Sequence, residues 1–247
     1  GRRAMREVRG PTALGGDPQR LWHLTRTLAL TDFKLRFFGS ALGYLWQLVR
    51  PLALFGILYA LFSVLALDDA PYYPQALLLG LVLYTFFADG TRGGLGSLVQ
   101  REGLLRKIDF PRLAVPLSVV LTALMNLALN LVPVFAFFLA AGGDFRLSWL
   151  ELPLLIVVLA VYATGWAMLL SSLFVRYRDV DPIWEVVLFA MFYGSPIFWT
   201  YELLSEEEPG IASWFFVNPF AAIVQQARHA LIGPEHASAA QALGGTE

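Results

Sequence analysis

Five long apolar stretches divide this chain, and polar or charged residues separate each stretch from the next. Each is at least as long as the ~17 residues that an α-helix needs to cross a hydrocarbon core ~30 Å thick. The predicted spans are residues 48–67, 72–88, 114–141, 152–175 and 183–199. The pattern predicts an all-α, polytopic membrane helix bundle at 48–199, preceded by a segment at 1–47 and followed by one at 200–247.

Basic residues fall almost entirely on one side of the membrane when these spans are threaded in order. Nine of the 18 Lys and Arg residues precede or begin the first span, five lie between the second and third, and two lie between the fourth and fifth. Only Arg146 and Arg228 fall on the other side. Because cytoplasmic loops are enriched in Lys and Arg, we expect a multi-pass protein of the cytoplasmic (inner) membrane with its N-terminus inside.

Composition excludes several classes of function. Only 15% of the residues are charged, against about 25% in soluble domains, and a net charge of −1 gives no reason to expect a nucleic-acid partner. The absence of cysteine excludes disulfides, thiolate metal sites and a cysteine nucleophile. No Gly-Lys pair occurs, so the phosphate-binding loop G-x-x-x-x-G-K-[ST] is impossible. We therefore predict no catalytic residue, no metal site and no cofactor on this chain.

Ionisable residues are nearly absent from the predicted spans. Only Arg50 and Glu185 fall inside them, and neither lies near the middle of a span. Proton-coupled carriers usually place such residues in the membrane as relays. The sequence therefore predicts that the energy for any transport comes from a soluble partner acting on the cytoplasmic loops.

Two of the predicted cytoplasmic loops have compositions suited to contact with such a partner. Residues 97–112 combine apolar and basic positions as a short docking helix does, although a helix on the membrane surface has the same pattern. Residues 176–182 form a short charged turn in which Pro182 suits the first position of a helix. An ordinary cytoplasmic turn has that composition too. A further interfacial helix at 19–40 is weakly amphipathic.

Four short motifs, in order along the chain, resemble segments of the type-2 ABC permeases that export bacterial polysaccharides. The run Leu-Gly-Tyr-Leu-Trp-Gln-Leu-Val-Arg-Pro-Leu at 42–52 is similar to the family's leader into its first span. Phe-Pro-Arg at 110–112 is similar to the segment before the third span, and Tyr-Arg-Asp-Val at 177–180 to the loop between the fourth and fifth. Asn-Pro-Phe at 218–220, followed by Arg228, resembles the outer re-entrant helices.

This resemblance implies a six-span ABC-2 type fold, of which five spans are visible in this sequence. It implies a homodimer of permeases bound to two ABC ATPase subunits, which carry the ATP and Mg. The substrate would be a lipid-linked glycan, namely an O-antigen or capsule polysaccharide or a teichoic acid. The chain would then be a transport subunit among membrane lipids and not an enzyme. An ABC-2 exporter of drugs or lipids is the alternative, and a membrane-embedded enzyme or scaffold is a third interpretation.

Three groups of residues are candidates for the transport machinery. The coupling candidates, on the two inner loops, are Arg101, Arg106, Lys107, Phe110, Arg112, Tyr177, Arg178 and Asp179. Aromatic rings can stack on sugars without a charge, and the pathway candidates are Tyr59, Phe62, Tyr84, Phe87, Phe192 and Tyr193. Ordinary membrane helices also carry aromatic belts at both interfaces. Residues 211–232 predict two short helices hinged at a proline, and the gate candidates are Phe215, Phe216, Asn218 and Pro219. A simple extracellular loop is the alternative.

Overall fold

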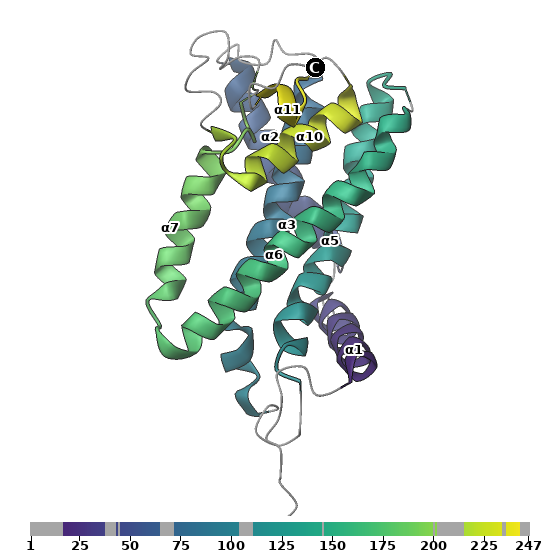
Figure 1. Cartoon of the computed structure of the whole chain (residues 1–247). Coiled ribbons are helices and arrows are strands. Elements are labelled where there is room, and N and C mark those ends of the chain that lie inside the picture. The colour runs from purple at the N-terminus through teal and green to yellow at the C-terminus, as the bar shows by residue number, and fades with distance from the viewer. Residues whose placement is uncertain are drawn as a thin grey trace, which may run out of the picture.

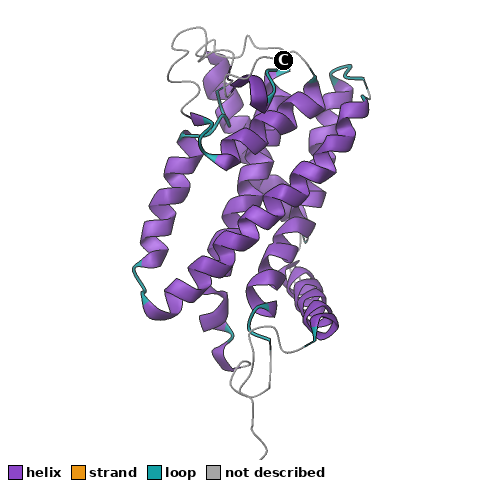
Figure 2. Ribbon diagram, viewed as in Figure 1, coloured by secondary structure: helices purple, strands orange, loops and turns teal. Residues whose placement is uncertain are grey.

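The computed structural model describes residues 17–37, 43, 45–64, 72–103, 111–144, 146–199, 201, 215–233 and 236–242. Every regular element in these ranges is a helix (Figure 2). The α-helices are α1 (Pro18–Phe37), α2 (Leu45–Val64), α3 (Tyr73–Gln100), α5 (Ala114–Ala140), α6 (Glu151–Arg176), α7 (Val180–Tyr193), α10 (Pro219–Ile232) and α11 (Ala239–Ala242), and a 3-10 turn, η1 (Leu147–Leu150), leads into α6. The predicted all-α class is confirmed.

The long helices α3, α5 and α6 pack against one another to form the body of the bundle (Figure 1). At the lower end in this view, α1 packs against α5 and is seen nearly along its axis. The α6–α7 turn lies at the same end, whereas α10 lies across the upper end and α7 stands at one edge. Three parts of the predicted cytoplasmic segments, namely α1, the end of α3 and the α6–α7 turn, thus lie at the lower end, and α10 lies at the opposite one.

Among the described residues, three helices are long and apolar enough to cross a membrane. They are α2, α5 and the continuous stretch Leu147–Arg176 formed by η1 and α6. These helices correspond to the first, third and fourth predicted spans with shifts of a few residues. The chain is therefore a membrane protein.

The second and fifth predicted spans differ from the helices that contain them. The stretch 72–88 is only the first part of α3, which continues to Gln100. The stretch 183–199 is not one helix, because α7 ends at Tyr193, just before Gly194 and Pro196. Proline removes a backbone donor and disfavours helical geometry in the residue before it. The 14 residues of α7 rise about 21 Å at ~1.5 Å per residue, less than the thickness of a hydrocarbon core.

Small residues bring α3 and α6 close together. Gly94 of α3 faces Ala167 of α6, and Gly90, one turn earlier, lies between Ala123 of α5 and Ala163 of α6; both α6 alanines are fully buried. A Cβ atom built on Gly94 would lie 2.5 Å from the Cβ of Ala167. Such small-x-x-x-small pairs allow the backbones of membrane helices to approach closely. Gly94 is thus required by packing.

Polar contacts attach α7 to α3. The Tyr84 hydroxyl donates to the Leu188 carbonyl at 3.0 Å, and the Trp184 indole N–H donates to the Thr91 hydroxyl at 3.1 Å. At the next residue of α3, Arg92 forms an exposed ion pair with Glu185 of α7 at 3.1 Å. These contacts fix the face that α7 turns toward the bundle. The opposite face exposes the outer stripe of α7, which consists of Ile183, Val186, Phe189 and Tyr193.

Candidate functional site

Aromatic rings from α2, α3 and α7 touch one another in a continuous series. Phe62 of α2 stacks on Phe198 with 5.4 Å between ring centroids. Phe198 lies 5.9 Å from Phe192 of α7, and Phe192 lies 4.9 Å from Tyr84 of α3. Ring pairs at ~4.5–7 Å are in favourable contact. The members of this aromatic network, with the rings that extend it on both sides, are Phe62, Tyr84, Phe87, Phe192, Tyr193, Phe198 and Phe220.

Five of the six predicted pathway residues belong to this network, but they differ in access. Tyr193 is 63% exposed and contacts Phe192 at 5.3 Å, so its ring is available to a ligand. Phe87 has no exposed surface and lies between Tyr162 and Phe220. In this conformation Phe87 is a core residue and lines no open path.

The sixth predicted pathway residue, Tyr59, lies elsewhere. Its ring stacks on Phe55, one turn earlier on α2, with 5.8 Å between centroids. Phe55 in turn contacts Phe137 of α5 edge-on at 5.7 Å. Tyr59 is therefore part of the packing between α2 and α5.

The predicted gate residues build the start of α10. Asn218 caps the helix, because its side-chain oxygen accepts a hydrogen bond from the Phe220 backbone N–H at 3.1 Å. Its amide nitrogen donates to the Ser195 hydroxyl at 3.1 Å, which joins α10 to the segment that follows α7. Pro219 occupies the first helical position, where proline is favoured. Pro219 thus begins a helix; any helix at 211–214 lies outside the described residues.

The two phenylalanines ahead of the cap contact different rings. Phe215 lies 5.1 Å from Trp199, and the buried Phe216 lies 5.4 Å from Tyr201, both in edge-on geometry. Trp199 and Tyr201 belong to the segment after α7. Phe215, Phe216 and Asn218 therefore all connect α10 to that segment.

Arg228, in the middle of α10, is almost completely buried, with 1% of its surface exposed. Its guanidinium donates to three backbone carbonyls: Ala76 of α3 at 3.2 Å, Trp199 at 3.1 Å and Ile197 at 2.7 Å. These carbonyls supply the acceptors that a buried cation requires, so in this conformation Arg228 needs neither water nor a polar lumen.

The far end of α10 is held by the turn before α6. The Ser148 hydroxyl donates to the Ala230 carbonyl at 2.8 Å, and the Trp149 indole N–H donates to the Leu231 carbonyl at 3.1 Å. These bonds satisfy carbonyls at a helix end that have no partner within the helix. With the cap at Asn218 and the contacts of Arg228, α10 is attached to the bundle at its start, middle and end.

The first of the two loops that hold the coupling candidates follows α3, and the structure describes only its borders. Arg101, directly after α3, forms a partly buried ion pair with Asp32 of α1. Arg112 is exposed. The candidates Arg106, Lys107 and Phe110 lie outside the described residues. The ion pair connects the border of this loop to the helix that packs across the lower end of the bundle.

Arg101 also borders a polar cavity of about 260 Å³ between α1, α3 and α5. Asp32 and Arg36 of α1 and Asp89 of α3 line it as well. Two acids face two bases, so the lining has no net preference for a cation or an anion. A cavity of this size and polarity can hold water, and displacement of the loop after Arg101 would change its shape.

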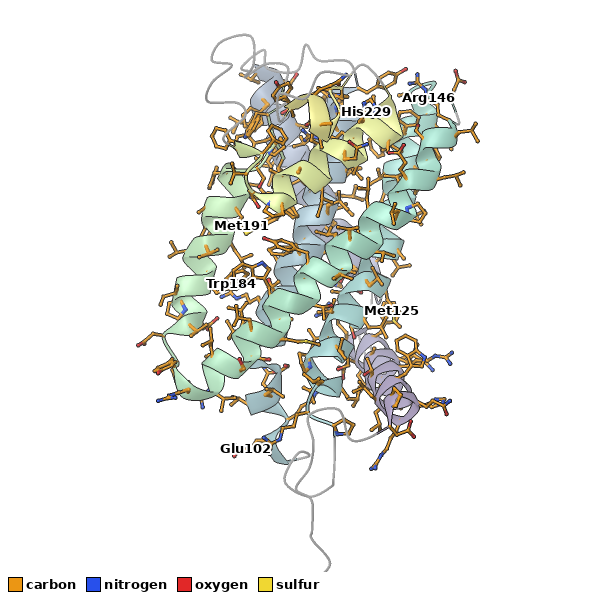
Figure 3. The ribbon with its side chains drawn as sticks, viewed as in Figure 1. Glu102, Met125, Arg146, Trp184, Met191 and His229 are labelled. Atoms are coloured by element: carbon orange, nitrogen blue, oxygen red, sulfur yellow. The ribbon has the colours of Figure 1, made fainter. Side chains whose placement is uncertain are left out.

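The second loop that holds coupling candidates is the turn between α6 and α7, in which Tyr177, Arg178 and Asp179 are all exposed. Tyr177 lies under the Arg176 guanidinium at 5.4 Å, and the Arg178 guanidinium lies over the Phe174 ring at 4.8 Å. Asp179 occupies the capping position of α7. Figure 3 shows this end of the molecule, with Glu102 labelled, opposite the end that carries Arg146 and His229. Both coupling candidates thus lie at one end of the bundle.

In the described part of the chain, no group of three or more His, Asp or Glu side chains is placed to hold a metal ion. His229 uses its Nδ1 atom in a 2.7 Å contact with the His236 carbonyl. The described residues instead provide the contacts that hold α10 to the bundle and the aromatic network with its exposed ring at Tyr193.

Comparison with known proteins matches most of the chain. Residues 23–232, from α1 to the end of α10, match the family described as ABC-2 type transporter. An O-antigen export system permease protein RfbA of Klebsiella pneumoniae is 27% identical over 205 residues, 83% of this chain and 78% of that protein. A protein of the same name from Myxococcus xanthus is 26% identical over 181 residues, 73% and 70% of the two chains. The polysialic acid transport protein KpsM of Escherichia coli is 22% identical over 212 residues, 83% and 80%.

Proposed function

The chain belongs to the ABC-2 type transporter family, and on that basis we propose that it is the permease subunit of an exporter of a lipid-linked polysaccharide. The observation that carries the proposal is the length of the similarity to permeases named for O-antigen export, which covers 83% of this chain and 78% of a relative. The family match over residues 23–232 includes the coupling loops, the aromatic network and α10 together. A teichoic acid, as another lipid-linked glycan, fits the same chemistry.

We propose that the partner is an ABC ATPase that contacts both coupling candidates from the cytoplasm and carries the ATP and Mg. The Arg101–Asp32 ion pair supports this proposal, because movement of the loop at 104–110 would displace α1 as well as α3. The turn at Tyr177–Asp179 would move α7 and, with it, the network rings Phe192 and Tyr193. The distribution of basic residues supports placing this end at the inner face of the cytoplasmic membrane, with the N-terminus inside.

We propose further that two copies of the permease form a homodimer around the path. The outer stripe of α7 supports this, since it leaves the large apolar side chains of Ile183, Val186 and Phe189 exposed together with the network ring of Tyr193. A glycan sliding over Tyr193 needs a second wall, and a second copy supplies one. In this proposal α10, attached at three points, is the closed form of a gate on the extracytoplasmic side.

Cross-linking tests the proposed contact with the ATPase. The chain has no native cysteine, so Lys107→Cys and Asp179→Cys each give a single labelling site. We expect both to cross-link to the co-purified ATPase encoded beside this permease. A matched Ser148→Cys variant at the opposite end should not cross-link. If neither Lys107→Cys nor Asp179→Cys reacts in a complex that hydrolyses ATP, the coupling assignment is refuted.

Replacing rings of the aromatic network with leucine, which is apolar but cannot stack, tests whether export depends on these rings. We expect Phe192→Leu combined with Tyr193→Leu to reduce surface glycan at least tenfold in a strain that lacks the native permease. Stacking on a ring is worth ~1–3 kcal/mol for nucleic-acid bases, and two lost contacts of that order reach tenfold. The double variant should still bind the ATPase.

Phe189→Leu is the matched control for this experiment. Phe189 lies on the same helix and is exposed to a similar degree as Tyr193, but it is outside the aromatic network, and leucine at this position keeps the outer stripe apolar for contact with a second copy. We expect its variant to export normally. Full export by the double variant would contradict the pathway, and export of a drug or free lipid without any glycan would favour the alternative class of ABC-2 exporter.

A further inference from the structure

An apolar pocket of about 220 Å³ lies under α1, against α5 and α6. Leu21 and Trp22 of α1, Leu121 of α5 and Ala160 of α6 are among its lining residues. An engineered apolar cavity of ~150 Å³ binds a molecule of benzene. The pocket is therefore large enough for a ring or for several methylene groups of a chain.

Thr25, a polar residue of the pocket lining, has a hydroxyl that lacks a partner. The Thr25 hydroxyl is buried, the residue being 3% exposed, and no described residue forms a hydrogen bond with it. A buried hydroxyl left in this way costs about 1–3 kcal/mol. The other threonine of the lining, Thr164, already donates to the Ala160 carbonyl at 2.7 Å. A ligand that offers one acceptor among apolar groups would satisfy Thr25.

The pocket lies at the depth where lipid chains begin. Its lining residues on α5 run from Leu117 to Leu124, three to ten residues into that helix. At ~1.5 Å per residue this is about 5–15 Å from the helix start. An interfacial helix buries its apolar face to ~5–10 Å, at the boundary between headgroups and acyl chains. A lipid beside α1 would have its ester groups at this level.

The exposed side of α1 is basic. The helix carries Arg20, Arg26, Lys34 and Arg36 against the single acid Asp32, which is already paired with Arg101. Each basic residue near an anionic membrane surface contributes about 1 kcal/mol of attraction. Arg26 follows Thr25 and lies one turn from Trp22, which is 56% exposed. The charge complements a phosphate just outside the pocket.

We propose that this pocket binds one acyl chain of an anionic phospholipid from the cytoplasmic leaflet. An ester carbonyl of the lipid accepts a hydrogen bond from Thr25, and its phosphate lies beside Arg26. The bound lipid fixes α1, and through the Arg101–Asp32 ion pair the border of the first coupling loop. The assignment rests on the proposed orientation of the chain, with α1 at the cytoplasmic surface, and not on the exported substrate.

Lipid binding to the purified full-length permease tests the proposal without any measurement of export. Delipidated protein in detergent is titrated with phosphatidylglycerol, and bound lipids are counted by native mass spectrometry. Ala160→Phe fills the pocket and should retain one lipid fewer than the wild type. Val161→Phe makes the same ring at the next residue, which is exposed outside the pocket, and should retain the wild-type number.

Two milder variants keep the test valid if Ala160→Phe does not fold. Thr25→Val should weaken phosphatidylglycerol binding about fivefold, as expected for one lost hydrogen bond of ~1 kcal/mol. Arg26→Gln should weaken phosphatidylglycerol about fivefold and leave phosphatidylcholine unchanged. Equal lipid counts in the wild type and Ala160→Phe, or equal affinity for the two lipids, would overturn the proposal.

Two further outcomes would assign the pocket to another occupant and overturn the proposal as well. Displacement of phosphatidylglycerol by a polyprenyl phosphate would give the pocket to the transported lipid. Conversion of the dimer to monomers in Ala160→Phe, without a change in the number of lipids per chain, would give it to a second copy of the chain.

Discussion

Replacing Arg228 with Met should destabilise the permease more than any other single substitution considered. Methionine keeps an unbranched side chain but has no N–H, so the carbonyls of Ala76, Ile197 and Trp199 lose their donor. Hydrogen bonds to charged groups contribute about 1.5–3 kcal/mol each and are not additive. We expect a loss of at least 3 kcal/mol in the free energy of unfolding, together with loss of export.

Thermal unfolding of the detergent-solubilised permease measures this effect. Arg228→Lys should recover only part of the stability, because an ammonium cannot reproduce the planar fork of a guanidinium. Arg146→Met is the matched control, since Arg146 is exposed at the same end of the molecule (Figure 3). It should unfold within about 0.5 kcal/mol of the wild type. An Arg228→Met protein as stable as this control would contradict the role assigned to the buried arginine.

Replacing Gly94 with Ala should be the next most damaging change. The added Cβ would lie 2.5 Å from the Cβ of Ala167 and 3.1 Å from its Cα, so α3 and α6 must separate. Overpacking of this kind costs about 1–3 kcal/mol. Ala167→Gly removes the closer of the two contacts, and the double variant should recover more than half of the loss.

A double-mutant cycle on unfolding free energies gives the coupling between these positions. Gly56→Ala in α2 provides the control, because a Cβ there meets nothing within 4 Å. Since alanine favours helix over glycine, Gly56→Ala should be neutral or slightly stabilising. Additive effects of Gly94→Ala and Ala167→Gly would show that the two residues do not touch.

The sequence predicted helices well where one signal decided the outcome. Long apolar runs gave α2, α5 and α6 to within a few residues, because apolar length alone limits a membrane helix. The cap at Asn218 and the start of α10 at Pro219 follow from local preferences for those positions. The predicted end of the fifth span at residue 199 was wrong, because the apolar run continues through Pro196 whereas α7 ends at Tyr193. The backbone effect of the proline outweighs the hydropathy.

The candidate site was predicted less completely, because its contacts join distant segments. Aromatic residues could be counted, yet the sequence did not indicate that Phe87 would be enclosed while Tyr193 stayed exposed. Gly90 and Gly94 form a readable G-x-x-x-G pattern, although its partners on α6 are not readable. The sequence named Arg228 but did not predict its burial, since its partners are backbone carbonyls, which every residue type carries.

The position of Arg228 in the chain also has a consequence for how the protein is made. Its three acceptors are synthesised first, Ala76 by 152 residues and Trp199 by 29. At roughly 5–20 residues per second, translation covers the last interval in a few seconds. In the proposed orientation the arginine crosses to the outer side after the earlier helices have been inserted, and it can be buried only if they have assembled correctly. A chain with misplaced helices would leave this cation without its three acceptors, which is costly for a buried charge.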